Sequence, residues 1–303
     1  MLDKKIRNRQ SGIITYGITP PKENNPPERL IEIAQRQIER INGMAVDGLV
    51  IYDIQDESDR NKDSRPFPFI STVDSVYYGE HYLKSIHLPK IIYRCVGKYT
   101  QDELSSWVNS EQSAPIYSVF VGASSSMSQH NKLSLRDAYG IPHGPNFILG
   151  GVAIPERHMT KKDEHLRIAG KQAAGCSFFI SQVTYHLEAA KNFLSDYYYY
   201  CREHQIEMVP ILFTITPCGS LQTLDFMKWL GISIPGWLEN DLKHSEDILS
   251  KSLDLSVAVF RDLFAYATEK GIPVGCNIES LSVRRLEIEA SVKLVEEIRG
   301  ILV

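Results

Sequence analysis

Cysteines are few in this sequence, and no two stand at a metal-binding or redox spacing. Only five occur in 303 residues, and none forms a C-x-x-C pair with another. A disulfide framework needs paired cysteines and a zinc ribbon needs closely spaced ones, so both are excluded. Free thiols are typical of a reducing compartment, and we therefore expect a cytoplasmic protein. The five are Cys95, Cys176, Cys201, Cys218 and Cys276.

Long hydrophobic runs and an excess of one charge sign are also missing. No apolar stretch reaches the roughly 18 residues that would span a bilayer. The basic N-terminus, M-L-D-K-K-I-R-N-R-Q, has no apolar segment behind it, so we predict no signal peptide. With 33 basic and 37 acidic residues, the net charge of -4 offers no attraction for nucleic acid. The sequence predicts a soluble protein with neither membrane nor nucleic-acid partners.

Several common catalytic and metal-binding motifs are missing as well. We find no G-x-G-x-x-G, no Walker loop, no G-x-S-x-G and no H-E-x-x-H. No two histidines lie three or four residues apart on a predicted helix, which argues against a metal site. His158 and His165 are seven residues apart, and we expect His165 to point to solvent.

Short apolar runs alternate with helical patterns along almost the whole chain. Eight such runs predict strands, and amphipathic segments such as Glu28 to Ile41 predict helices between them. This alternation favours a (β/α)8 barrel, with a doubly wound sheet as the alternative. No linker or shift in composition divides the chain, so we predict one domain over residues 1–303. The predicted strands are 12–18, 47–53, 90–96, 115–121, 146–154, 176–182, 208–214 and 274–278.

Polar side chains follow many of these predicted strands at their carboxyl ends. In a parallel α/β fold that edge binds ligands. Each residue alone is compatible with a solvated strand end, but together they would form a ring around one mouth. Amides that both donate and accept hydrogen bonds suit a heterocyclic amide such as a pterin. The ring comprises Tyr16, Asp53, Gln55, Arg94, Gln182, Tyr185, Thr214, Thr216, Asn277 and Glu279.

The stretch from Asn146 to Tyr185 carries the most specific pattern. It contains G-G-V-A-I-P-E-R-H, a charged helix through Lys171, and then A-G-C-S-F-F-I-S-Q-V-T-Y. This order resembles the methylenetetrahydrofolate reductases, which show G-V-A-x-Y-P-E-x-H, K-x-x-A-G-A and a strand ending I-T-Q. Thr19-Pro20-Pro21-Lys22 upstream and I-S-I-P-G-W-L downstream are similar to further family motifs.

The resemblance implies a barrel that acts in one-carbon metabolism and methionine biosynthesis. FAD would lie across the barrel mouth, and NAD(P)H would reduce it for hydride transfer to 5,10-methylenetetrahydrofolate. The resemblance puts Gln182 at the folate. It puts His158, Glu164 and Lys171 at flavin-contacting positions. Arg167 shares a helical face with Glu164 and Lys171, and a solvated salt-bridge stripe is the alternative for that face.

Two reactive carboxylates of the family are missing. Gly17 stands where the resemblance requires the general-acid glutamate, and Ala123 stands where it requires an aspartate near the flavin. One interpretation is a divergent reductase that uses Glu279 or Asp53 with water, and binds flavin differently or works with a redox subunit. The other is a non-catalytic folate-binding protein. The sequence leaves a homo-oligomer open, and Tyr197 to Tyr200 is either an interface patch or core.

Overall fold

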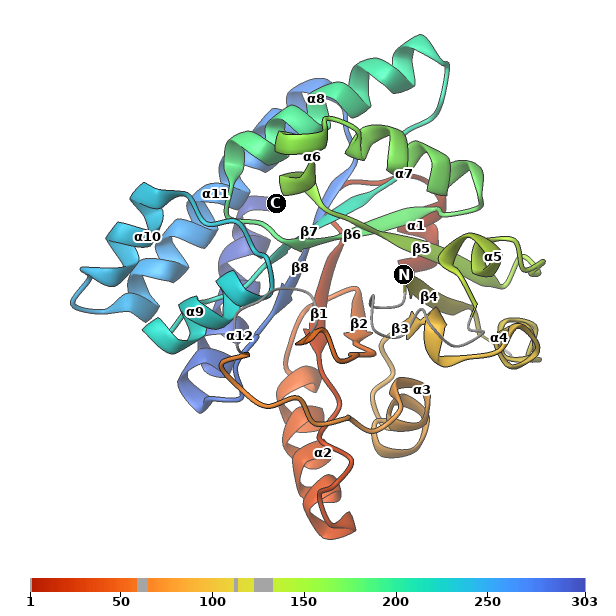
Figure 1. Ribbon diagram of the computed structural model, residues 1–303, viewed down its shortest axis with the longest axis horizontal. Helices are drawn as coiled ribbons and strands as arrows, with labels where there is room; N and C mark the ends of the chain where they lie inside the picture. The colour runs from red at the N-terminus through yellow and green to blue at the C-terminus, as the bar shows by residue number, and fades with distance from the viewer. Residues whose placement is uncertain (1, 59–64, 112–113, 123–132, 303) are drawn as a thin grey trace.

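The computed structural model describes residues 2–58, 65–111, 114–122 and 133–302. Within these ranges, eight parallel strands close into a barrel in the order β1 to β8, with β8 pairing back to β1 (Figure 1). This closure confirms the (β/α)8 barrel and excludes the doubly wound sheet. The strands are β1 (Ile14–Ile18), β2 (Gly48–Ile51), β3 (Lys90–Cys95), β4 (Ile116–Val121), β5 (Phe147–Ala153), β6 (Phe178–Val183), β7 (Ile211–Ile215) and β8 (Val274–Glu279).

Helices follow the strands and cover the barrel. A capping box starts α4: the Thr100 side chain accepts from the Glu103 N–H, and the Glu103 side chain accepts from the Thr100 N–H. The helices are α1 (Leu2–Arg7), α2 (Pro27–Asn42), α3 (Ser75–Tyr77), η2 (Tyr78–Tyr82), η3 (Val96–Lys98), α4 (Gln101–Val108), α5 (Leu135–Tyr139), α6 (Pro155–Lys161), α7 (Glu164–Ala173), α8 (Leu187–Glu203), α9 (Leu221–Trp229), α10 (Gly236–Lys243), α11 (Ile248–Lys270) and α12 (Arg285–Leu302).

Alternate residues of each strand face the barrel interior and the helix layer, because side chains in a strand alternate between its two faces. The interior is a separate apolar cluster that includes Val50, Tyr93 and Phe178. Helix α1 belongs to this cluster through Leu2 and Ile6, both almost fully buried, and Leu2 lies against Gly48 at the start of β2. The short helix therefore covers the amino-terminal end of the barrel, and the carboxyl ends of the strands form the other end.

Two adjacent glycines in β5 allow close packing on both of its faces. A Cβ on Gly150 would lie 2.5 Å from the Phe178 ring inside the barrel. A Cβ on Gly151 would lie 2.9 Å from the Phe179 ring on the helix side. Real Cβ atoms do not approach other atoms so closely, so β6 aromatics occupy the space of the missing side chains. The G-G pair of the sequence is thus a packing requirement of the barrel wall.

Candidate functional site

A buried polar network crosses the carboxyl end of the barrel on strands β1, β7 and β8. The Asn277 side-chain oxygen accepts from the Thr15 hydroxyl at 2.9 Å. Its amide nitrogen donates to the Tyr52 hydroxyl at 2.9 Å and to the Thr214 hydroxyl at 3.2 Å. Asn277 is fully buried, and these three bonds use its oxygen and both of its N–H groups. It therefore positions Tyr52 instead of presenting free groups to a ligand.

Glu279 lies one layer further toward the mouth on the same face of β8. Its side chain is largely buried, and burial raises the pKa of its carboxyl to about 7, while a hydrogen bond from Tyr52 acts in the opposite direction. The Tyr52 ring packs edge-on against Tyr93, with 4.7 Å between ring centroids, which holds the hydroxyl near the carboxyl. The result is a carboxyl group that titrates near neutrality at the ligand-binding edge of a barrel.

Gly17 and Glu279 are register partners on the neighbouring strands β1 and β8. A Cβ placed on Gly17 would lie 2.8 Å from the Tyr52 ring and 3.2 Å from the Glu279 Cβ. Tyr52 and Glu279 thus fill the space that a side chain at position 17 would need. A carboxyl group is present beside position 17, but it comes from the adjacent strand.

Four other predicted ring residues point toward the helix layer. The Tyr16 hydroxyl bonds to Ser291 of α12, at 2.7 Å. Arg94 donates to Asp74 at 3.0 Å and lies 3.9 Å above the Tyr99 ring. Asp53 accepts from the Cys95 N–H at 2.8 Å and forms an ion pair with Lys98. The Tyr185 hydroxyl donates to the Thr216 carbonyl. Their hydroxyl and carboxyl groups are committed to contacts within the protein, whereas the Arg94 Nε is buried without a hydrogen-bond partner among the described residues.

Gln182 has a side-chain contact that reaches beyond its strand. It is half-buried, and its amide nitrogen donates to the Leu230 carbonyl at 3.2 Å. Gln55, in the segment after β2, donates to the Gly122 carbonyl at 2.9 Å. The structure therefore brings Asn277, Glu279 and Thr214 together and gives Gln182 a fixed orientation at the end of β6.

Comparison with known proteins decides the family. A model of the methylenetetrahydrofolate reductases matches residues 135–276. A solved Clostridium thermocellum protein is 56% identical, with a TM-score of 0.89, over 99% of this chain and 100% of its own. It is described as uncharacterized and as binding two copies of 5-methyl-5,6,7,8-tetrahydrofolic acid. The chain belongs to the methylenetetrahydrofolate reductase family.

More distant solved structures match over most of the chain at low identity. Dihydropteroate synthase from Thermus thermophilus is 12% identical, covers 96% of this chain and 93% of its own, and has a TM-score of 0.45. A 2,3-dimethylmalate lyase is 13% identical, covers 97% and 93%, and has a TM-score of 0.40. No curated protein sequence matches the chain.

The side chains that the resemblance places at flavin contacts are bonded to other groups of the protein. Glu164 is fully buried, accepts from the Ile154 N–H at 2.8 Å and pairs with Arg157 at 3.2 Å. The Lys171 amine donates to the Val152 carbonyl at 2.6 Å, and burial lowers its pKa. Arg167 pairs with Asp163 on the helix surface. Among the described residues, these side chains do not form an open cationic cradle for a flavin pyrophosphate.

His158 and His165 also differ from their expected settings. His158 bonds to Asp196 of α8 at 2.9 Å, and its ring lies edge-on to the His165 ring, with 5.3 Å between centroids. The prediction that His165 points to solvent is wrong, because its Nδ1 is buried and burial lowers its pKa. Tertiary contact between α6 and α7, which spacing alone does not reveal, brings the rings together. Ala123 lies outside the described residues.

Glu156, in the P-E-R-H motif, is a second buried carboxyl group. It has no hydrogen-bond partner among the described residues beyond its own backbone N–H. Burial raises its pKa to about 8, and the nearby Glu164 charge acts in the same direction. The residue is the second of α6, and Ile154 alone separates that helix from β5. It adds a neutral acid to the wall of the barrel near the carboxyl end of β5.

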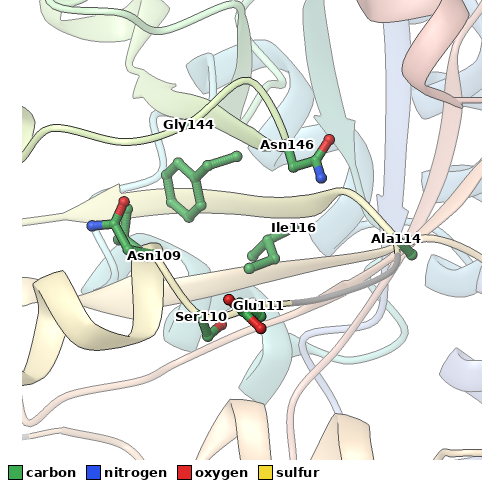
Figure 2. A pocket seen from close by; sticks show the side chains of 9 residues that line it. Asn109, Ser110, Glu111, Ala114, Ile116, Gly144 and Asn146 are labelled. Carbon is green, nitrogen blue, oxygen red and sulfur yellow. The ribbon is translucent and has the colours of Figure 1, made fainter.

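A surface pocket of ≈ 390 Å³ lies at the opposite end of the barrel (Figure 2). Its wall includes Ile116 and Phe147, the first residues of β4 and β5, together with Asn109 from the end of α4. Barrel proteins of this kind bind ligands at the carboxyl ends of their strands. We therefore assign the candidate site to the edge that carries Glu279 and not to this pocket.

Tyr52 is the site residue that sequence reasoning missed. It follows β2 directly, two positions after the interior residue Val50, so both side chains point to the barrel axis. The alternation in D-G-L-V-I-Y-D would have assigned Tyr52 to the inner face and Asp53 to the outer one. The prediction followed charge at the strand end and chose Asp53.

Proposed function

We propose that this protein binds a reduced folate of the 5-methyltetrahydrofolate type at the carboxyl end of its barrel. The observation that carries the proposal is Glu279, a largely buried carboxyl group at the mouth whose pKa lies near neutrality. The relative that is 56% identical over the whole chain, and that is described as binding 5-methyltetrahydrofolic acid, supports the ligand class. A role in folate-dependent one-carbon metabolism is the corresponding biological function.

Recognition would rest on the hydrogen-bonding edge of the pterin. The ring N–H and the exocyclic amino group of a reduced pterin both donate, and an ionised carboxylate accepts two such bonds in parallel. Glu279 supplies that carboxylate, and Tyr52, held by Asn277, sets its orientation. Gln182 would meet a second edge of the ligand from β6. The buried setting excludes water, which strengthens these bonds relative to bonds at a surface.

Calorimetric titration with 5-methyltetrahydrofolate tests this assignment. We expect saturable binding by the wild type and a roughly 10- to 100-fold weaker affinity for Glu279→Gln, which loses a charge-assisted pair of bonds. Glu297→Gln, an exposed position on α12, is the matched control and should bind as the wild type does. No binding by the wild type, or equal affinities in all three proteins, would refute the proposal.

A divergent reductase is the second candidate, and one observation favours it. Glu279 lies beside Gly17, the position of the general acid in the reductase family, and its raised pKa suits a proton donor at neutral pH. The residue would then protonate a nitrogen of the bound folate during reduction. Since the described flavin-position residues do not fit FAD, we derive no hydride step from them.

Turnover at saturating folate separates the two candidates. For a reductase, Glu279→Gln should lower the turnover rate by roughly 100- to 10,000-fold even when the site is full. Gly17 and Tyr52 would remain unchanged in this variant, so the loss of turnover would be due to the missing proton donor. In the contrary outcome, the wild type binds 5-methyltetrahydrofolate yet turns over no folate when reduced flavin and NAD(P)H are supplied. That result would refute the reductase candidate and retain folate binding without catalysis.

A further inference from the structure

Three potential metal ligands converge on the flank of the barrel, away from Glu279. His158 comes from α6, His165 from α7 and Asp196 from α8. One ligand atom from each lies within 4.8 Å of the other two. Figure 1 shows these helices together beside β5 and β6. Asp196 is distant in sequence from both histidines, and the packing of α6 and α7 on α8 brings the three residues together.

The protein leaves two ring nitrogens in this cluster without partners. His158 is 3% exposed, and His165 is half-buried. The Nδ1 atoms of both rings are buried, and neither has a hydrogen-bond partner among the described residues. An imidazole nitrogen buried without a partner costs free energy, because its bond to water is lost and not replaced. Such a nitrogen is a feature expected of a ligand position.

The surroundings suit a cation that binds neutral imidazole. The Phe193 ring backs the His158 ring at 6.2 Å between centroids, and Tyr200 lies 5.7 Å from His165. A neutral imidazole coordinates a metal ion through a ring nitrogen that carries no proton. Asp196 is 53% exposed and supplies both a negative charge and access from solvent.

We propose that His158, His165 and Asp196 bind a divalent transition metal ion, with Zn²⁺ as the best match. Two imidazole nitrogens and one carboxylate oxygen are preferred zinc ligands, and water would complete a tetrahedral site. Carboxylate-only sites would suit Mg²⁺ or Ca²⁺ instead. The site would clamp α6 and α7 onto α8, and it is independent of the proposed folate function.

Metal binding to the full chain tests this site. We expect one tight Zn²⁺ per chain in competition with a chromophoric chelator, and visible d–d bands of a low-coordinate site with Co²⁺. Asp196→Asn changes an exposed side chain and His165→Ala shortens a half-buried one, so both variants should preserve the fold. Each should weaken Zn²⁺ binding by more than the roughly 10- to 100-fold that the loss of an outer-shell partner costs. His158→Ala should do the same.

Matched controls separate this site from unspecific binding to histidine. His244→Ala, at the exposed position directly after α10, should bind Zn²⁺ as the wild type does. Zn²⁺ should raise the melting temperature of the wild type and of His244→Ala, and should leave that of Asp196→Asn unchanged. The proposal is overturned if no stoichiometric binding occurs, or if the cluster variants bind Zn²⁺ as tightly as His244→Ala.

Discussion

At the scale of single residues, Glu279 connects the fold to the proposed chemistry. It occupies the barrel mouth because β8 pairs with β1, and because Gly17 leaves room for the Tyr52 ring beside it. The absence of a side chain at Gly17 of β1 thus leaves space for Tyr52, which follows β2, and for Glu279 of β8. Gly17, where the resemblance expects a general acid, and the buried Glu279 lie on adjacent strands.

The pH dependence of folate binding should report the ionisation of Glu279. Its pKa is about 7, and the proposed ligand donates hydrogen bonds to the ionised form. Affinity should therefore fall as the pH decreases below about 7, by roughly tenfold per pH unit. Calorimetry between about pH 6 and about pH 8 measures this, and Glu279→Gln should show a flat profile. A wild-type profile as flat as that of the variant would contradict the role.

Glu156 should lower stability as the pH rises. Its pKa is raised from 4.5 in the unfolded chain to about 8 in the folded protein, so the folded state binds more protons between these values. The free energy of unfolding then decreases with pH across this window. Urea denaturation gives the free energy of unfolding of Glu156→Gln minus that of the wild type. This difference should be more positive at about pH 8 than at about pH 5. The same difference at both pH values would be evidence against the assignment.

Residue identities could be predicted better than residue orientations. Asn277, Glu279 and Gln182 were placed at strand ends from the sequence, and the structure puts Asn277 and Glu279 in one network at the mouth. Tyr16 and Arg94 share that strand-end signal but lie on the opposite strand face. A polar residue at a strand end does not reveal its face unless the apolar alternation is followed along the whole strand.

At the scale of elements, β5 and β6 depend on the absence of a side chain at Gly150. The Phe178 ring fills the place of that side chain inside the barrel, at 2.5 Å from a Cβ built there. Gly150→Ala should therefore lower the free energy of unfolding by about 1–3 kcal/mol through overpacking. Urea denaturation measures the change.

Gly170 in helix α7 provides the opposite case for comparison. A Cβ there meets no atom within 4 Å, and its backbone is helical. Gly170→Ala should raise stability by up to about 1 kcal/mol, because alanine loses less conformational freedom in a helix. If both substitutions changed the free energy of unfolding in the same direction, close packing against Phe178 would not explain why position 150 is a glycine.

The periodicity of the sequence predicted which segments form strands and helices. It did not predict the short helix α1 or the contacts between helices. All eight predicted strands exist, with ends that differ by a few residues, as in β7 at Ile211–Ile215. Helix α1 was missed because its six residues are too few to show a helical period. Burial of Leu2 and Ile6 against the barrel stabilises it, together with the Lys5–Asp47 ion pair. The approach of α6, α7 and α8 that joins His158 to His165 likewise depends on packing between helices.

At the scale of the whole molecule, closure of the barrel puts the network of β1, β7 and β8 at one end and α1 at the other. None of the described helices is long and apolar enough to cross a membrane. That residues 1–303 form one domain stays a prediction. In the Tyr197–Tyr200 segment, Tyr197 is buried in the core and Tyr199 is 56% exposed, and an interface at this segment stays a prediction.

Ligand binding should stabilise the whole barrel, because the proposed site joins strands from both ends of the sequence. With 5-methyltetrahydrofolate at 100 times its dissociation constant, the free energy of unfolding should rise by about 2.7 kcal/mol. Urea denaturation with and without the ligand measures the rise. Glu279→Gln at the same ligand concentration should gain less. An equal gain in both proteins would indicate that the ligand binds elsewhere.

The most direct measurement is a crystal structure of the protein with 5-methyltetrahydrofolate. We predict a pterin at the carboxyl end of the barrel, with its N–H and amino groups within hydrogen-bonding distance of the Glu279 carboxylate. The relative is described as binding two copies, so every bound copy must be located. The central claim would be contradicted if no copy contacted Glu279, for example if each lay in the amino-terminal pocket of Figure 2.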